Sequence, residues 1–529
     1  MASEGRAPGV DEGAVSGAEP RRIFPLAARP AYALAALSGV VYFLGFPGAN
    51  LWPLSFVALA PLLVALTGQA PRRAAGLGLV QGLSLSLFGF YWLFGMLQRF
   101  SGFSAPLCAV FMVLLCAYQG GRVALTGWLH ARAEQRGWPS APAFALAFVA
   151  GELVYPLLFP WYFGASVHNA PALLQTADLG GPYLVGLVLV APNLALAELL
   201  RARLAQRPLA PRLVAVGLAI PVIAALYGLV RLRRIDAAIA GAPSIKIGIA
   251  QGNQPLKGRV SALPTHLELT RRLREQGAEL VLWSEGADTH TYPEDRYQEL
   301  AKSEITRRLG VPAIIGTGIS RPTATPRRTF FNTALLSDAE GTITGRYDKQ
   351  LLLAFGEYLP LGSTFPFLYR WSPNSGRFSP GTSLDPLILG EHRVSVIICY
   401  EDILPAFVNR MVRHADPDLI VNLTNDTWFG DTTEPLEHLA LAQLRAVEHR
   451  RYLIRATNSG LSAIIDAAGR VALRGGQFRE EALLGEAHFL RERTGYELLG
   501  DAPWYACTAA IALMALVEKR RIFRSVAPS

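Results

Sequence analysis

Long apolar stretches dominate the first 232 residues of this chain, and they constrain its fold more than any other feature. A helix needs about 20 mostly apolar residues to cross the hydrocarbon core of a membrane. Stretches approaching this length lie at residues 31–46, 51–66, 75–97, 104–129, 141–163, 183–200, 213–230 and 504–517. We therefore expect a seven-helix transmembrane bundle over residues 31–232 and an eighth transmembrane helix over residues 503–518.

Basic residues gather at alternate ends of these stretches, as the positive-inside rule describes. They precede the first span, lie between spans two and three, four and five, and six and seven, and follow the eighth. They are Arg21, Arg22, Arg29, Arg72, Arg73, Arg132, Arg136, Arg201, Arg203, Arg207, Arg212, Lys519, Arg520, Arg521 and Arg524. With eight spans, all of them fall on one side, which predicts cytoplasmic termini. The polar region between spans seven and eight is then expected on the opposite side.

A second basic cluster departs from this pattern. Arg231, Arg233 and Arg234 lie just beyond span seven, on the side where few basic residues are expected. Two explanations fit them: the side chains snorkel to lipid headgroups, or they belong to a linker helix. We weight the global pattern above this cluster.

Composition excludes several function classes. The net charge is +9, but the arginines at span ends account for it, so we expect no nucleic-acid partner. Residues 1–30 lack the apolar core of a signal peptide and are expected to form a disordered cytoplasmic tail, and residues 519–529 a second cytoplasmic tail. No cysteine pair or His/Cys cluster has metal-ligand spacing. We expect no metal and no cofactor.

From residue 244 the pattern changes to short β-rich runs that alternate with helix-like runs, which predicts an α/β layered domain over residues 244–490. Strands are expected at residues 245–249, 280–283, 313–316, 333–337, 394–398, 419–423 and 462–465. Helices are expected at residues 267–276, 296–309, 404–414 and 437–450.

Three polar side chains follow expected strands. They are Glu285, Lys349 and Cys399. Ligands of α/β sheets bind at the carboxyl ends of strands, so these residues could meet there. A carboxylate can take the proton of a thiol, and an ammonium can stabilise a developing oxyanion. Taken singly, each has a simpler explanation: a structural cysteine, a helix cap, a solvated ion pair.

The words around these residues are more specific. Asp348-Lys349 precedes Phe355-Gly356-Glu357-Tyr358-Leu359-Pro360, and Ile398-Cys399-Tyr400-Glu401 precedes Asn425-Asp426-Thr427-Trp428-Phe429-Gly430. Residues 244–490 resemble the carbon–nitrogen hydrolase (nitrilase) family. With the apolar half included, notably Gly45-Phe46-Pro47 and Phe159-Pro160-Trp161, the chain resembles the apolipoprotein N-acyltransferases.

The resemblance implies an αββα nitrilase-like domain inserted between transmembrane helices 7 and 8, on the periplasmic face of a bacterial inner membrane. It implies that Glu285 is the general base, Lys349 stabilises the oxyanion and Cys399 is the nucleophile. Glu357 resembles a second, supporting carboxylate, although a structural ion pair or cap would also explain it. Other residues resemble those lining the site, with core packing or a structural ion pair as alternatives: Tyr400, Glu401 and Trp428.

The implied reaction is ping-pong acyl transfer. A phospholipid acyl chain passes through a Cys399 thioester to the N-terminal S-diacylglyceryl-cysteine of a lipoprotein. The partners are therefore a phospholipid donor and a lipoprotein acceptor, and nothing requires more than a monomer. Two other hypotheses remain: a membrane-tethered amidase that hydrolyses small amides, and a non-enzymatic scaffold, against which the intact set of three residues argues.

Two positions depart from the family pattern. Ser284 stands where the family usually has a proline before the glutamate, and serine loosens the φ angle of that turn. The family also places a tryptophan a few residues after Gln251-Gly252-Asn253, whereas residues 255–258 contain none. These departures bear on the rigidity of the Glu285 turn and on lipid preference.

Overall fold

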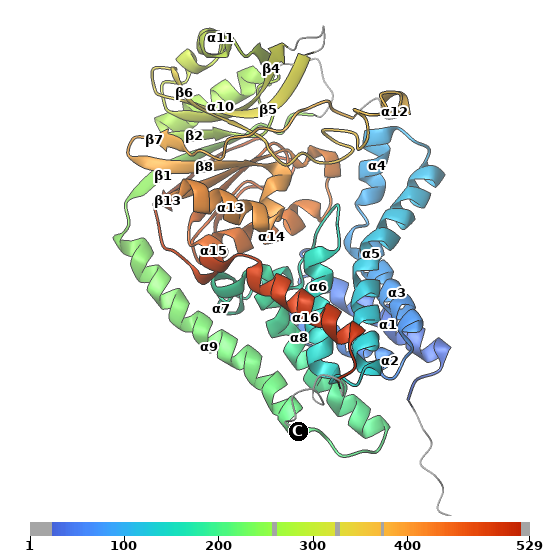
Figure 1. The fold of residues 1–529 in the computed structure, drawn as a ribbon. Helices are drawn as coiled ribbons and strands as arrows, with labels where there is room; N and C mark the ends of the chain where they lie inside the picture. The colour runs from blue at the N-terminus through green and yellow to red at the C-terminus, as the bar shows by residue number, and fades with distance from the viewer. Residues whose placement is uncertain (1–23, 256–261, 323–327, 372–374, 520–529) are drawn as a thin grey trace, which may run out of the picture.

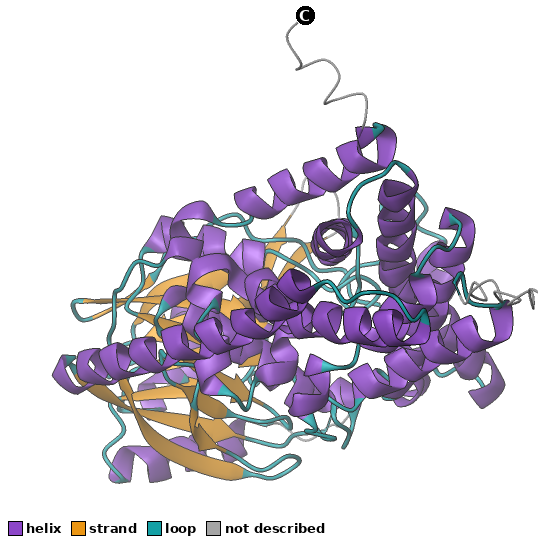
Figure 2. Ribbon diagram, turned by 90° about the horizontal axis from the view of Figure 1, so that it is seen from below, coloured by secondary structure: helices purple, strands orange, loops and turns teal. Residues whose placement is uncertain are grey.

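The structure, a computed structural model, describes residues 24–255, 262–322, 328–371 and 375–519. It has a helical half and an α/β half (Figure 1). Seen along the other axis, the strands gather on one side of the molecule (Figure 2). The predicted α/β layered domain and the apolar helices are both confirmed.

The helical half is built from helices of very different lengths. They are α1 (Ala28–Phe43), η1 (Trp52–Phe56), α2 (Ala60–Leu66), α3 (Pro71–Gly89), α4 (Leu93–Ser101), α5 (Ala105–Gln135), α6 (Ser140–Val154), η2 (Phe163–Val167), α7 (Pro171–Leu174), α8 (Ala177–Leu204), α9 (Pro211–Gly241) and α16 (Ala502–Leu516). Within the described ranges, α5, α8 and α9 are long and apolar enough to cross a membrane, and the pair α3 and α4, bent by 68°, makes up to four.

Three of the expected spans are not continuous helices. Residues 51–66 divide into η1 and α2, each of which starts at a proline position. Residues 75–97 bend between α3 and α4, where Phe90 and Trp92 turn inward and are buried. Residues 141–163 remain helical only to Val154, because two prolines at 156 and 160 follow and proline cannot continue a helix.

The ends of the expected tails also differ in part. Helix α1 begins at Ala28, so residues 28–30 are helical rather than part of a disordered tail. The rest of the expected N-terminal tail, up to residue 23, and residues 520–529 lie outside the described residues.

The α/β half contains two sheets. The first has the order β13-β1-β2-β4-β5-β6, with β3 beside β4; the second has the order β12-β11-β10-β9-β8-β7. The strands are β1 (Ser244–Gln251), β2 (Leu280–Trp283), β3 (Thr291–Pro293), β4 (Ala313–Pro322), β5 (Arg328–Ser337), β6 (Ile343–Asp348), β7 (Leu387–Leu389), β8 (His392–Ile398), β9 (Leu419–Thr424), β10 (Tyr452–Thr457), β11 (Ala463–Ile465), β12 (Val471–Arg474) and β13 (Glu481–His488). Parallel pairs β1/β2, β2/β4, β8/β9 and β9/β10 occupy the middle of the sheets.

Alternation along the strands explains the layers. In β2, Leu280 and Leu282 join the core between the sheets, while Val281 and Trp283 face the opposite way. On that outer side lie α10 (Leu263–Glu275) and α11 (Tyr297–Glu304). The second sheet is covered by α13 (Pro405–Ala415) and α14 (Glu434–His449). The layers therefore run helix, sheet, sheet, helix.

All seven expected strands and all four expected helices exist, with shifted ends. Residues 296–309 form α11 followed by the short turn η3 (Thr306–Arg308). Six of the described strands were not expected, namely β3, β6, β7, β10, β12 and β13. In β10, Arg455 interrupts the apolar run. The burial of that arginine has its own cause, which lies at the site.

Helix α14 joins the two halves. One of its faces packs on the second sheet, and the other contacts α8 of the helical half. Beside it, Arg450 contacts Asp178 of α8 at 2.6 Å, and Arg231 of α9 contacts the same carboxylate at 2.9 Å. Arg231 also pairs with Glu492. Of the two explanations for the basic cluster beyond span seven, the linker helix fits Arg231. This residue lies in α9 and ties that helix to the α/β half.

Candidate active site

Glu285, Lys349 and Cys399 come together at the ends of strands from both sheets. Glu285 follows β2, Lys349 follows β6 in the same sheet, and Cys399 follows β8 in the facing sheet. The turn with Glu285 lies against Gly316 of β4, where an added Cβ would be 2.3 Å from the Ser284 carbonyl oxygen. A glycine is therefore needed for this close approach.

Lys349 lies between two carboxylates. Its Nζ is 2.7 Å from Glu357 Oε2 and 3.4 Å from Glu285 Oε1, and the residue is only 1% exposed. Burial lowers the pKa of Lys349, but Glu285 and Glu357 outweigh it, so its pKa lies well above the usual value. The lysine therefore carries a positive charge at neutral pH, at the place where an oxyanion would need it.

Asn332 of β5 holds the two carboxylates in register. Its Nδ2 donates to Glu285 Oε1 at 2.7 Å and to Glu357 Oε1 at 2.9 Å. Burial raises the pKa of Glu285, against the lowering by Lys349 and by the Asn332 hydrogen bond. A raised pKa of Glu285 lies closer to the pKa of a thiol, and this makes the carboxylate a better base.

Cys399 begins the turn η4 (Cys399–Ile403) in a strained conformation. Its φ is +51°, a region that few residues other than glycine and asparagine adopt. The Asn422 amide of β9 donates to its carbonyl oxygen at 3.3 Å. Burial and then Glu285 raise the pKa of the thiol, Lys349 lowers it, and the net pKa is well above the usual value. A thiol in this setting needs a base to become a nucleophile.

Glu401 fastens η4 to the segment after Lys349. Its carboxylate accepts hydrogen bonds from the backbone N–H groups of Ile398, Gln350 and Leu351 at 2.7 to 3.0 Å, and from the Tyr347 hydroxyl at 2.8 Å. Burial raises its pKa to about 7. The side chain is fully buried and is not among the residues that line the cavity beside the thiol.

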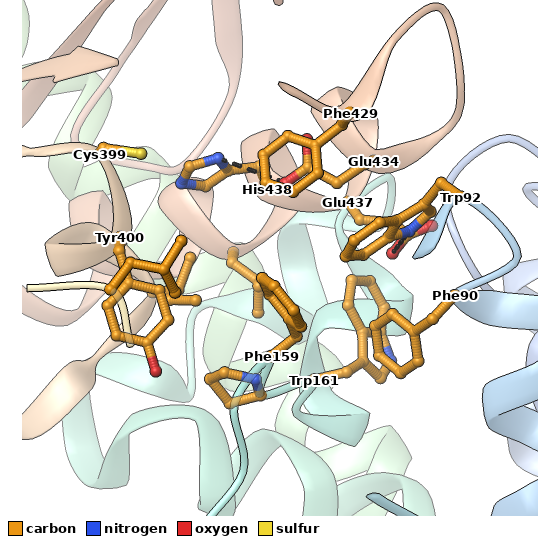
Figure 3. A pocket seen from close by; sticks show the side chains of 14 residues that line it. Phe90, Trp92, Phe159, Trp161, Cys399, Tyr400, Phe429, Glu434, Glu437 and His438 are labelled. Carbon is orange, nitrogen blue, oxygen red and sulfur yellow. Dashed lines mark hydrogen bonds and ion pairs between the residues drawn. The ribbon is translucent and has the colours of Figure 1, made fainter. Parts of the chain in front are cut away.

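A small cavity of about 40 Å³ lies beside the thiol, with mostly apolar walls that also include Glu434, Glu437 and His438. Cys399 and Tyr400 lie at one side of it, and Phe90 and Trp92 at the other (Figure 3). The helical half thus supplies much of the wall, including Phe159, Pro160 and Trp161. Aromatic side chains of the helical half therefore enclose the thiol on this side.

The remaining expected site residues divide between the cavity and its surroundings. Tyr400 lines the cavity as expected. Trp428 lies instead in a contact with α4, where its ring packs on Phe100 at 5.7 Å, and Phe429 takes its place in the cavity wall. Sequence reasoning missed Asn332, although a lone asparagine in the apolar run of residues 330–336 was a usable signal.

A cluster beside the cavity has the residue types of a metal site. Asp426, Glu434 and His438 each offer a ligand atom within 4.8 Å of the others. Arg455, however, donates to both oxygens of Asp426, and both ring nitrogens of His438 contact carboxylates. These groups are already matched in charge, which leaves little for a metal ion to balance.

The two departures from the family pattern have different outcomes. Ser284 is buried at the end of β2, and among the described residues its Oγ has no hydrogen-bond partner. The serine hydroxyl therefore adds no anchor to the turn, which is confined by Gly316 instead. In the stretch that lacks the tryptophan of the family, residues 256–258 lie outside the described residues.

Comparison with known proteins was consistent over both halves. The model of the apolipoprotein N-acyltransferase N-terminal domain matches residues 38–195, and that of carbon-nitrogen hydrolase matches residues 246–490. An apolipoprotein N-acyltransferase of Geobacter metallireducens is 31% identical over 93% of this chain and 95% of its own. One from Azotobacter vinelandii is 33% identical over 94% and 97%, respectively.

Proposed function

Because the chain belongs to the apolipoprotein N-acyltransferase family, we propose that it moves a phospholipid acyl chain through a Cys399 thioester to the N-terminal S-diacylglyceryl-cysteine of a lipoprotein. The protein is an acyltransferase of the carbon–nitrogen hydrolase superfamily. The assignment of Glu285, Lys349 and Cys399 to its reaction is the proposal.

In the first half-reaction, Glu285 takes the Cys399 proton as the sulfur attacks an ester carbonyl of the phospholipid. Lys349 and a backbone N–H near Cys399 stabilise the tetrahedral oxyanion. The carbon–oxygen bond then breaks, and Glu285 returns the proton to the departing oxygen. A lysophospholipid leaves, and the acyl chain stays on sulfur.

In the second half-reaction, the α-amino group of the acceptor attacks the thioester carbonyl. Glu285 takes a proton from the attacking nitrogen, and the carbon–sulfur bond breaks. The proton passes to the Cys399 sulfur, so the enzyme returns to its starting state. Glu357 lies against Lys349 and keeps the ammonium facing the site, while Tyr400 forms part of the wall.

The cavity carries this proposal. Its walls are mostly apolar and come from both halves, with Trp92 and Phe159 from the helical half and Tyr400 from the α/β half. An acyl chain that stays in the bilayer suits the aromatic part of these walls. No observation favours the amidase hypothesis over acyl transfer.

We extend the proposal to the domains and the topology. We propose a seven-helix transmembrane bundle over residues 31–232, a catalytic domain over residues 244–490 on the periplasmic side and an eighth transmembrane helix over residues 503–518, with both termini in the cytoplasm. Helix α5 supports this, because its 31 residues span about 46 Å. Its basic end contacts Lys519, and α4, which precedes its other end, contacts the α/β half through Arg99.

The experiment is intact-mass measurement of the full chain after incubation with phospholipid and no acceptor. Wild type is expected to gain the mass of one fatty acyl group and to release lysophospholipid. Cys399→Ser keeps the size of the side chain but not its nucleophilicity, and is expected to show no adduct. An unmodified wild-type chain under these conditions, with small amides hydrolysed, contradicts the proposal.

A further inference from the structure

His438 of α14 lines the cavity and bridges two buried aspartates. Its Nε2 is 2.6 Å from Asp402 Oδ1, and its Nδ1 is 3.2 Å from Asp426 Oδ1. Arg455 contacts the same two carboxylates, at 2.8 and 2.9 Å. Asp402, Asp426 and Arg455 are fully buried, and His438 is 5% exposed.

The four groups balance their charges. Burial and Arg455 lower the pKa of His438, but Asp402 and Asp426 raise it to about 10, so the ring is an imidazolium at neutral pH. Two cations then face two anions. Glu434, 3.7 Å from the ring, has a pKa raised well above its usual value by burial and by Asp426.

Each bridged aspartate belongs to a different part of the site. Asp402 is in η4, the turn that begins with Cys399. Asp426 begins η5 (Asp426–Phe429), whose Trp428 and Phe429 contact the helical half. Arg99 Nε of α4 donates to the Trp428 carbonyl oxygen at 2.9 Å, and the Phe429 ring packs on Trp92 at 5.1 Å.

The neighbouring side chains favour the same connection. Arg455 also donates to the Asn422 side-chain oxygen at 3.1 Å, and the Asn422 amide in turn holds the Cys399 carbonyl. One helical turn before His438, Glu434 starts α14, and Glu437 accepts a hydrogen bond from the Trp92 indole at 3.2 Å. The bridge thus has the thiol on one side and α4 with its preceding loop on the other.

We propose that His438 is a positioning residue for the acyl transfer: by joining Asp402 to Asp426, it holds the turn that carries Cys399 in register with the loop that docks on α4. The inference rests on the proposed function. Stability does not explain the arrangement, because buried ion pairs often stabilise a fold less than apolar side chains of the same size. Register between the thiol and a bilayer-held ester does explain it.

The test compares two reactions of Cys399 in the detergent-solubilised full chain. Acylation is measured by intact mass, with micelles of phosphatidylethanolamine and phosphatidylglycerol as donor, and alkylation with iodoacetamide. In His438→Gln, acylation at saturating phospholipid is expected to slow by roughly 10- to 100-fold, the cost of a misplacement of about 1 Å. Alkylation is expected to change by less than about threefold, because a small soluble reagent needs no register with α4.

His414→Gln is the matched control. His414 also pairs with an aspartate, Asp385, at 3.0 Å, but both are exposed on the surface of the α/β half. This variant is expected to acylate at the wild-type rate. Rates are expressed per folded molecule from thermal unfolding. If His438→Gln does not fold, Asp402→Asn, which keeps the shape of the side chain, is measured in the same way and is expected to reproduce the split.

Two outcomes overturn the inference. One is acylation at the wild-type rate in folded His438→Gln or Asp402→Asn. The other is an equal loss of acylation and alkylation, which would make His438 a determinant of thiol reactivity rather than of register. Failure of the proposed function is a separate result, because wild type itself would then form no acyl adduct.

Discussion

Asn332 offers the sharpest test of how the acid–base pair works. Its single amide nitrogen donates to both Glu285 and Glu357, at 2.7 and 2.9 Å. A hydrogen bond to a charged group contributes about 1.5 to 3 kcal/mol. In Asn332→Ala, Glu285 loses one such bond and its orientation toward the thiol, so acylation of Cys399 is expected to slow by roughly 10- to 100-fold.

The pH dependence gives this prediction a sign. The Asn332 hydrogen bond lowers the pKa of Glu285, so its loss raises that pKa and leaves the base protonated up to a higher pH. The deficit of Asn332→Ala relative to wild type is therefore expected to be largest at low pH and to shrink as the pH rises.

The assay is single-turnover acylation followed by intact mass between pH 6 and 9. Asn409→Ala is the control, because Asn409 is a buried asparagine of α13, away from the acidic pair. A rate deficit that stays constant across this range, or that grows with pH, would refute the reasoning about Glu285 as the base.

Three further changes test the surroundings of the thiol. Lys349→Met leaves two carboxylates without their cation. It is expected to abolish acylation and to lower the free energy of unfolding by about 3 to 5 kcal/mol. Near-wild-type values in both measurements would exclude a role of this ion cluster in acylation and stability. Glu401 has a folded-state pKa of about 7, above its usual value. The free energy of unfolding of wild type should therefore fall relative to that of Glu401→Gln as the pH rises through about 4.5 to 7. Denaturant titrations in which the difference between the two proteins stays constant over this interval would contradict it. Gly316→Ala would bring a Cβ to 2.3 Å from the Ser284 carbonyl and is expected to slow acylation at least about tenfold, whereas Gly241→Ala, with no atom within 4 Å of the new Cβ, should leave the acylation rate unchanged.

The strand ends were predictable because their signal is local. An apolar run followed by a polar residue is visible in the sequence at Glu285 and at Cys399, and the structure brings these two residues together with Lys349. An α/β layered domain followed from the same alternation of runs, whereas the αββα order of the layers was implied by the resemblance to the nitrilase family. Asn332 and His438 lie within buried elements, and their partners are far along the chain. The sequence shows a lone asparagine in an apolar run at Asn332, but it does not show which groups either residue contacts.

The errors have a physical pattern as well. Apolar composition predicted membrane-length helices at residues 51–66 and 141–163, but prolines divide or end them. Apolar composition indicates which segments prefer an apolar environment. Whether such a segment continues as a helix depends on its backbone, which proline interrupts. Composition also failed to predict β10, because Arg455 places a charge inside its apolar run. That charge is compensated by Asp402 and Asp426, which lie elsewhere in the chain.

Helix α14 has little surface left for water, since it packs on the second sheet and on α8 at once. The α/β half is therefore not separable from the helical half without exposing apolar surface. Cut away from the helices, it would open the face of α14 that carries Leu441 and Leu444, and it would leave Arg450 without Asp178.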